Sequence, residues 1–144
     1  MSVDPLCGRL NRGAAVPGLK SINHISIIAS DYPSGRAFSC AILRFTLLQE
    51  TYREAGDSWK GDLSLNGEYL IELFSFPSAP PRPSFPEAIG LRHLAFNVDD
   101  IEASVAELKQ RGVECEPIRI DPITGKPFTF FADPDGLPLE LCQN

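Results

Sequence analysis

The chain contains two stretches in which apolar and polar residues follow the same order. Each opens with a short, mostly apolar run, residues 22–28 in the first and 91–97 in the second, and has a histidine at the third position of the run. An aspartate, Asp31 or Asp100, follows each histidine after seven residues. Aspartate is a favoured helix N-cap because its side chain accepts hydrogen bonds from free backbone N–H groups. Each run therefore predicts a strand followed by a helix.

The two predicted helices end differently. In the second, apolar residues recur at spacings of four and three over residues 101–108, and Gly112 follows as a stop signal. The first, residues 32–43, has apolar residues on one side but ends at Arg44, where a glycine would be expected.

Three strand-like runs follow each helix. Asn66-Gly67 is a hairpin signal in the first stretch, and residues 133–136 form an Asp-Pro-Asp-Gly turn signal in the second. Both stretches therefore follow the order β-α-β-β-β. We predict an α+β fold in which two βαβββ modules form a cupped mixed sheet. The predicted strands after the helices are residues 46–52, 60–65 and 69–76, then 113–120, 127–132 and 137–142.

A proline-rich segment divides the two modules. Residues 77–90 contain five prolines, which disfavour both helices and strand ladders, so this segment is predicted to be a stiff linker. The predicted first module is residues 20–76 and the second is 91–144, together one domain over 20–144. Residues 1–19 form a predicted loose leader.

Composition and charge exclude several classes of partner and location. The 144 residues carry a net charge of -6, which argues against nucleic acid as the main partner. No apolar run approaches the roughly 20 residues of a membrane helix, and no secretory signal is found, so no membrane partner is expected. Four cysteines without a CxxC motif are expected to be free thiols, and the protein to be cytoplasmic.

Histidine and glutamate occur at matching positions in the two modules. Glu72 follows His24 by 48 residues, and Glu140 follows His93 by 47 residues. Modules related by a pseudo-twofold axis would direct both pairs to one place, so the cup is predicted to surround a metal site. Taken alone, a strand histidine is more often an ordinary polar residue, and Glu72 could be an edge-strand charge. Against this, the chain has only these two histidines, and both fall at equivalent positions.

The residue types suit a divalent metal ion. Both glutamates lie in apolar strands, where a carboxylate is costly unless it is paired or metal-bound. Two imidazoles and two carboxylates would bind one divalent ion per site, with Ni²⁺ or Zn²⁺ expected and Co²⁺ or Mn²⁺ as alternatives.

Residues 131–140, Phe-Ala-Asp-Pro-Asp-Gly-Leu-Pro-Leu-Glu, are characteristic of a known family. Over residues 19–144 the chain resembles the vicinal oxygen chelate superfamily, which includes glyoxalase I, methylmalonyl-CoA epimerase, extradiol dioxygenases and bleomycin-binding proteins. Residues 52–55, 57–63 and 71–77 are similar to a group of small glyoxalase-like proteins. The chain departs from the family pattern at Arg44, usually glycine, and at Ser39, often aromatic.

By this resemblance, His24, Glu72, His93 and Glu140 match the four metal positions of the family. Glyoxalase I has a glutamate at the second position, where the epimerase typically has glutamine. Bleomycin-binding members lack the metal set.

The resemblance implies a metal-dependent lyase of the lactoylglutathione lyase type, active in methylglyoxal detoxification. The substrate would be a 2-oxoaldehyde–thiol adduct, such as a glutathione adduct, that reacts through an enediolate. Glu140 is the expected general base and Glu72 the second proton carrier. The alternatives are an epimerase acting beside a thioester and a non-catalytic binding or resistance protein.

The sequence also offers candidates for residues that contact the substrate and an expectation for the oligomeric state. Trp59 is a candidate for stacking on substrate, although a core position is the more common role of tryptophan. We expect a homodimer, because each small module leaves sheet edges to protect. The metal site can then lie within one chain or between two. The candidate cations for carboxylates of the substrate are Arg53, Lys60, Arg92, Arg119 and Lys126.

Overall fold

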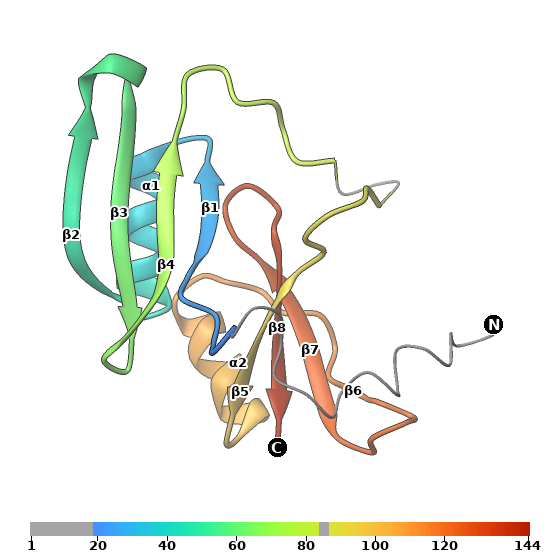
Figure 1. Ribbon diagram of the computed structural model, residues 1–144. Helices are drawn as coiled ribbons and strands as arrows, with labels where there is room; N and C mark the ends of the chain where they lie inside the picture. The colour runs from blue at the N-terminus through green and yellow to red at the C-terminus, as the bar shows by residue number, and fades with distance from the viewer. Residues whose placement is uncertain (1–18, 84–86) are drawn as a thin grey trace.

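The computed structural model describes residues 19–83 and 87–144, so the predicted leader lies almost entirely outside the described residues. The structure confirms the α+β class and the two βαβββ modules (Figure 1). The first module consists of β1 (Ile25–Ala29), α1 (Tyr32–Ala37), a π-helical turn (Phe38–Ile42), β2 (Thr46–Arg53), a 3₁₀ turn (Glu54–Gly56), β3 (Ser58–Leu65) and β4 (Glu68–Ser75). The second consists of β5 (Leu94–Val98), α2 (Ile101–Gln110), β6 (Arg119–Ile120), β7 (Pro127–Ala132) and β8 (Pro138–Gln143).

The strands form two separate mixed sheets of four. Their orders are β1-β4-β3-β2 and β5-β8-β7-β6. In each sheet the first strand of the module pairs in parallel with the last, and the other pairings are antiparallel. This arrangement puts the start of the first strand beside the middle of the last strand, where the two predicted glutamates lie.

Two predicted elements differ from the structure. The strand predicted over residues 113–120 is reduced to the two residues of β6, because Pro117 has no backbone N–H for a ladder. The backbone before β6 is attached to β7 irregularly: Glu116 N donates to Phe130 O at 2.8 Å, and Thr129 Oγ1 donates to Glu116 O at 2.7 Å. The helix predicted over residues 32–43 is α-helical for one half and π-helical for the other.

The predicted helix caps are present. Asp31 accepts a hydrogen bond from Ser34 N at 3.0 Å, and Asp100 accepts one from Ala103 N at 3.1 Å. The Ser34 hydroxyl also donates to Asp31, and these hydrogen bonds lower the pKa of the Asp31 carboxyl. Each helix therefore begins where the sequence predicts.

Positive backbone φ angles mark the turns. Asn66 and Gly67 have φ values of 51° and 83°, as a tight hairpin requires, and Gly112 has 82° after α2. Arg44 has φ 65°, so this arginine adopts the left-handed conformation for which glycine would be expected.

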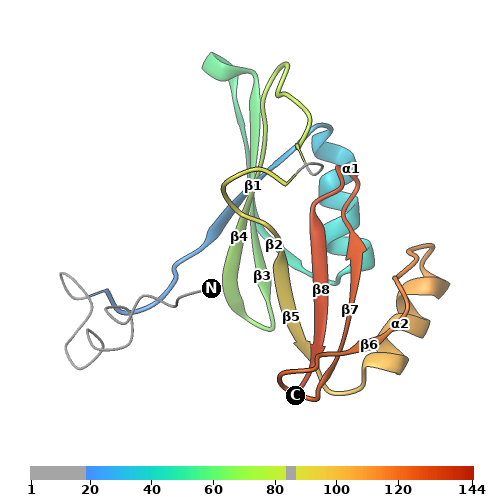
Figure 2. The ribbon, with the colours of Figure 1, turned by 90° about the vertical axis from the view of Figure 1, so that its right-hand side faces the viewer.

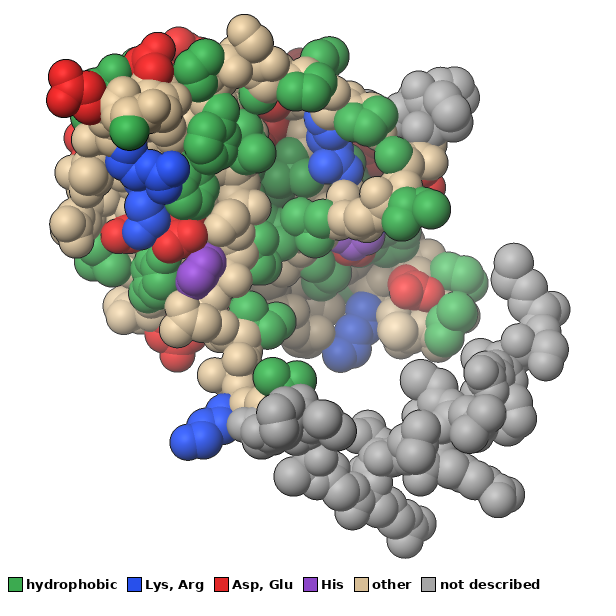
Figure 3. Space-filling view, turned by 45° about the horizontal axis from the view of Figure 1, so that its top comes forward, with side chains coloured by type: hydrophobic (Ala, Val, Ile, Leu, Met, Phe, Trp, Pro, Cys, Tyr) green, Lys and Arg blue, Asp and Glu red, His purple; other side chains and the backbone are tan. Residues whose placement is uncertain are grey.

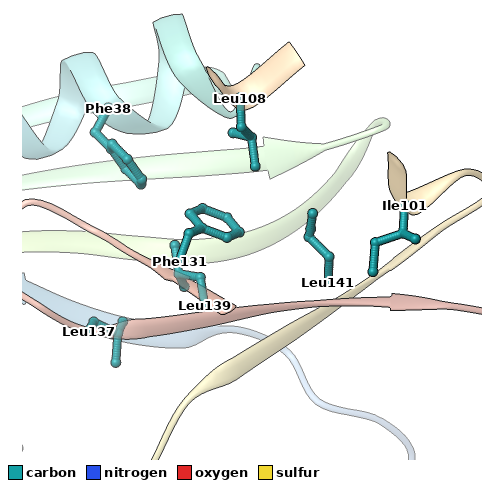
Figure 4. Close-up of a cluster of buried hydrophobic side chains, with 7 residues drawn as sticks. All are labelled: Phe38, Ile101, Leu108, Phe131, Leu137, Leu139 and Leu141. Carbon is teal, nitrogen blue, oxygen red and sulfur yellow. The ribbon is translucent and has the colours of Figure 1, made fainter. Parts of the chain in front are cut away.

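The two modules share their hydrophobic core. Phe38 from the first module packs with buried residues of the second (Figure 4), and Ile27, Leu94 and Phe96 contact the buried clusters of both modules. Figure 2 shows α1 on the side of the first sheet that faces the second module. The helix-bearing faces of both sheets are therefore buried within the chain, and the opposite faces point outward.

A hydrogen-bonded link also joins the modules. Ser30, just after β1, donates from its backbone N to Asp135 Oδ2 at 2.9 Å, and its hydroxyl donates to the same carboxylate. Asp135 belongs to the Asp-Pro-Asp-Gly turn, so this turn connects β7 to β8 and also binds the first module.

Candidate metal centre

The first predicted pair is formed at the start of β1. His24 precedes the strand by one residue, and its Nε2 lies 3.1 Å from Glu72 Oε2 on β4. The other ring nitrogen, Nδ1, lies 2.7 Å from Asn23 Oδ1. In the tautomer that donates from Nδ1 to Asn23, Nε2 presents its lone pair toward Glu72, as a metal-binding histidine does.

Several polar groups surround Glu72. Ser26 Oγ donates to Oε2 at 3.0 Å, and Lys60 Nζ lies 3.1 Å from Oε1 and 3.0 Å from Asp62 Oδ1. Tyr69 donates from its hydroxyl to Asp62 at 3.3 Å. Burial raises the pKa of the Glu72 carboxyl. Hydrogen bonds from Lys60 and Ser26 lower this pKa and together outweigh the effect of burial, so the pKa lies below its ordinary value. Glu72 is therefore a hydrogen-bonded carboxylate in a charged setting.

The second pair is formed at the start of β5. His93 Nε2 lies 3.0 Å from Glu140 Oε2 on β8. The His93 ring meets the edge of Phe130, with ring centroids 5.2 Å apart. A pocket of about 260 Å³ opens beside Glu140 and includes Lys126 and Phe128 in its lining.

Strand register shows how differently the two pairs are surrounded. In the first sheet Asp62 lies opposite Glu72, and Lys60 lies opposite Phe74. In the second sheet the corresponding positions are Phe130, opposite Glu140, and Phe128, opposite Cys142. The first pair is thus flanked by a charged lysine and aspartate, and the second by two aromatic rings.

The donor sets of both pairs fit a divalent metal ion. Two ligands about 2.1 Å from an ion and at right angles lie about 3.0 Å apart. The observed separations of 3.1 Å and 3.0 Å correspond to such neighbouring ligands. The side chains are also accessible, at 33% and 15% exposure for His24 and Glu72 and 25% and 16% for His93 and Glu140.

Within one chain the four residues form two pairs and not one cluster. Among residues 19–83 and 87–144, no group of three or more His, Cys, Asp or Glu side chains is placed to hold a metal ion. The two histidines are separate purple patches in Figure 3. Since Ile71, Leu73, Leu139 and Leu141 are buried in the core, strand alternation turns the glutamates between them outward.

Three of the residues predicted to contact the substrate have other partners in the structure. Trp59 stacks on the buried Tyr32 at 5.4 Å between ring centroids, so it packs on the helix side of the sheet, away from Glu72. Arg92 and Arg119 are paired with Glu87 and Glu116, each at 2.9 Å.

Asp62 is a site neighbour that the sequence does not reveal, and Lys60, predicted only as a candidate cation, lies beside it. Counting outward from the Asn66-Gly67 turn gives the pairs Leu65–Glu68 and Ser64–Tyr69, but a bulge then shifts the register between Leu63 and Ser64. Without the bulge, Asp62 would lie opposite Ile71, on the core side. The bulge brings Asp62 beside Glu72.

Comparison with known proteins assigns the chain to a family. Residues 21–141 match the model of the Glyoxalase/Bleomycin resistance protein/Dioxygenase superfamily, and the chain belongs to this superfamily. It is 68% identical to YaeR of Escherichia coli K12 over 126 residues, covering 88% of this chain and 98% of YaeR.

Two further comparisons cover most of the chain. The crystal structure of a glyoxalase family protein from Enterococcus faecalis has 49% identity and a TM-score of 0.81, covering 85% of this chain and 97% of that one. A 2-epi-5-epi-valiolone epimerase from an Actinomyces species is 27% identical, covering 91% of this chain and 83% of the epimerase.

Two smaller expectations are also addressed by the structure. Cys40, Cys115 and Cys142 are free thiols, as predicted, and Cys7 lies outside the described residues. Within the described ranges, no helix has the length and apolar character needed to cross a membrane.

Proposed function

We propose that His24, Glu72, His93 and Glu140 bind one divalent metal ion in a glyoxalase I-like lyase or isomerase. The observation that carries the proposal is the repetition of one geometry: a histidine Nε2 lies 3.0–3.1 Å from a glutamate oxygen at equivalent positions of both modules. When bound, Ni²⁺ or Zn²⁺ would act as a Lewis acid toward vicinal oxygens of the substrate.

We propose that the site is completed between two chains. The helix-bearing faces hold the modules together within a chain and leave each His–Glu pair on an outward face. Pairing the first module of one chain with the second module of another would bring two outward pairs face to face. This arrangement needs no change in the shared core.

The surroundings of the two glutamates favour different roles in proton transfer. Among the described residues, Glu140 forms an ion pair with His93 and a hydrogen bond with the Cys142 thiol, and it is flanked by Phe130. Because no described cation other than His93 holds it, Glu140 is the better placed of the two to leave a ligand position and accept a proton. Glu72 is held by His24, Ser26 and Lys60. We propose that Glu140 removes a carbon-bound proton next to a carbonyl and that Glu72 assists its return to the neighbouring carbon.

The preferred substrate is a 2-oxoaldehyde–thiol adduct, such as a glutathione adduct. A second candidate is an epimerase reaction, favoured by the 27% identity with the Actinomyces enzyme. Both reactions begin with removal of a proton beside a carbonyl, so one site can serve either.

An assay with methylglyoxal and glutathione separates the candidates. The purified protein is stripped of metal, reloaded with Ni²⁺, Zn²⁺, Co²⁺ or Mn²⁺, and assayed for thioester formation. Metal-dependent thioester formation is the expected result. Metal-dependent exchange of substrate protons with deuterated solvent, without thioester, would favour an epimerase. Ligand binding that needs no metal and leads to no exchange would indicate a binding protein.

A further inference from the structure

Two cations lie near one aromatic ring on the face that carries Glu72. The Arg53 guanidinium carbon lies 5.6 Å from the centre of the Phe74 ring, and Lys60 lies opposite Phe74 in the strand pairing. Phe74 is two residues beyond Glu72 on β4, so all three side chains are next to the first His–Glu pair.

The charges in this cluster do not balance. The positive charge of Lys60 is balanced by Asp62, and the negative charge of Glu72 would be balanced by the metal ion that it is proposed to bind. Arg53 is exposed, and its guanidinium makes no ion pair with any described residue. Arg53 is thus the cation of this cluster that is left without a paired carboxylate in the described part of the chain.

Hydrogen-bonding capacity is also left over. An ammonium group has three donors, and Lys60 uses one toward Asp62 and one toward Glu72. The planar guanidinium of Arg53 presents a fork of donors that suits a carboxylate. The two residues can therefore bind an anion, and the Phe74 ring supports the Arg53 guanidinium.

The other candidate cations are placed differently. Arg119 also lies over an aromatic ring, Phe128, but it is paired with Glu116. Lys126 shares the pocket beside Glu140, where it contacts the side-chain oxygen of Asn144 and lies near Asp121. At the register positions of Lys60 and Asp62, the second module has Phe128 and Phe130.

We propose that Arg53 and Lys60 form an anion subsite, and that the substrate carries a carboxylate a few bonds away from its vicinal oxygens. This inference rests on the proposed metal site, because it places the substrate beside Glu72. The aromatic side formed by Phe128 and Phe130 then receives an uncharged part of the substrate. Arg53 and Lys60 would determine specificity without taking part in the chemical step.

A pair of chelating probes tests the subsite directly. N-hydroxysuccinamic acid offers two vicinal oxygens and a carboxylate two carbons away, and its methyl ester replaces the charged carboxylate with a slightly larger neutral group. Calorimetry on the metal-loaded protein should give about tenfold tighter binding for the acid, since hydrogen bonds to charged groups contribute at least this much. The preference should fall to near unity in Lys60→Ala and in Arg53→Ala, and Lys60→Arg should restore most of it.

Lys126→Ala is the matched control, because it removes a lysine from the pocket beside Glu140. It should keep the tenfold preference. Loss of the preference in Lys126→Ala, or equal binding of acid and ester by the unmodified protein, would overturn the inference. Metal content is measured on every variant, so that a weakened metal site is not mistaken for a lost anion contact.

NMR titration with succinate tests anion binding by Arg53 and Lys60 in the metal-free protein. Signals of the unmodified protein should shift more than those of the double variant Arg53→Ala/Lys60→Ala, and equal shifts would overturn the inference. A protein that binds no metal but shows this difference would contradict the proposed function and leave the anion subsite standing.

Discussion

Glu72 and Glu140 occupy equivalent positions on β4 and β8 but have different neighbours. Glu72 lies opposite Asp62 and near Lys60, and Glu140 lies opposite Phe130. A carboxylate that accepts several hydrogen bonds is held in one orientation, and one with few such bonds can move. The two glutamates are therefore expected to respond differently to substitution.

Glu140→Gln should retain much of its metal but lose most of its turnover. The amide oxygen can still coordinate, although it cannot accept a proton, and loss of a general base typically lowers kcat by about 10²- to 10⁴-fold. Steady-state kinetics at measured metal content test this. Glu116→Gln, which changes a glutamate paired with Arg119, is the control, and unchanged kcat in fully loaded Glu140→Gln would exclude Glu140 as the base.

His93→Ala should lose metal. It removes one of two imidazoles from the proposed ligand set, and weak coordination by the remaining residues would not survive gel filtration. Elemental analysis after gel filtration should show about one ion per site in the unmodified protein and close to none in the variant. Asn97→Ala, on the same face of β5, serves as the control. Equal metal content in His93→Ala and the unmodified protein would rule out His93 as a ligand.

At the scale of elements, hydrophobic alternation predicted most strands because each sheet buries one face. Residues 127–132 of the prediction coincide with β7, and Asp31 and Asp100 cap the helices as expected. The shortened β6 was not predicted, because residues 113–120 are strand-like while Pro117 limits pairing. The bulge beside Leu63 was not predicted either, because it depends on how three strands fit together and not on local pattern.

The four candidate ligands and their grouping into two His–Glu pairs were predicted from spacing and resemblance, but the separation of the two pairs within one chain was not. Spacing gives the position of a residue along its own module. The orientation of one module against the other depends on which faces are buried, and the shared core around Phe38 decides this. Similarly, the role of Lys60 follows from a register that no single strand encodes.

Helix α2 should depend on its N-cap. Asp100→Ala removes the acceptor of the Ala103 N–H and should lower the free energy of unfolding by about 1 kcal/mol. Urea denaturation monitored by circular dichroism measures the change. Asp99→Ala is a matched control, since Asp99 is an exposed neighbour with no side-chain hydrogen bond among those described, and its effect should be near zero. Equal effects of the two substitutions would contradict the capping role.

Arg44→Gly should stabilise the protein. Arg44 holds a left-handed conformation with φ 65°, which costs a residue with a Cβ atom about 1 kcal/mol and costs glycine little. The expected gain in the free energy of unfolding is up to about 1 kcal/mol. Arg44→Ala removes the same charge but keeps the Cβ atom, so the difference between the two variants isolates the backbone effect. A glycine variant no more stable than the alanine variant would refute it.

At the scale of the whole molecule, we expect a homodimer, because the outward faces are left uncovered within one chain. Each module exposes a sheet face that carries a His–Glu pair, and both modules have large exposed apolar side chains, including Ile28 at 53% and Ile120 at 61% exposure. Light scattering after size-exclusion chromatography at micromolar concentration should give about 32 kDa, twice the 15.8 kDa of one chain. A mass near that of one chain would show that the outward faces remain unpaired.

Mixing two inactive variants tests whether each site is shared between chains. In a shared arrangement, His24 and Glu72 of one chain meet His93 and Glu140 of the other. His24→Ala and Glu140→Ala homodimers are then each broken at both sites. A mixed dimer, however, regains one intact site, built from the first module of the Glu140→Ala chain and the second module of the His24→Ala chain.

The two variants are therefore unfolded together, refolded in equal amounts and assayed beside each variant refolded alone. Random assortment gives half of the dimers as mixed, each with one intact site of two, so about a quarter of the unmodified activity should return. Metal content should rise in parallel, which provides a readout independent of turnover. A mixture of Glu72→Ala with His24→Ala is the matched control, because both changes fall on the first module and no pairing restores a site. If each site is built within one chain, the first mixture would stay as inactive as the control.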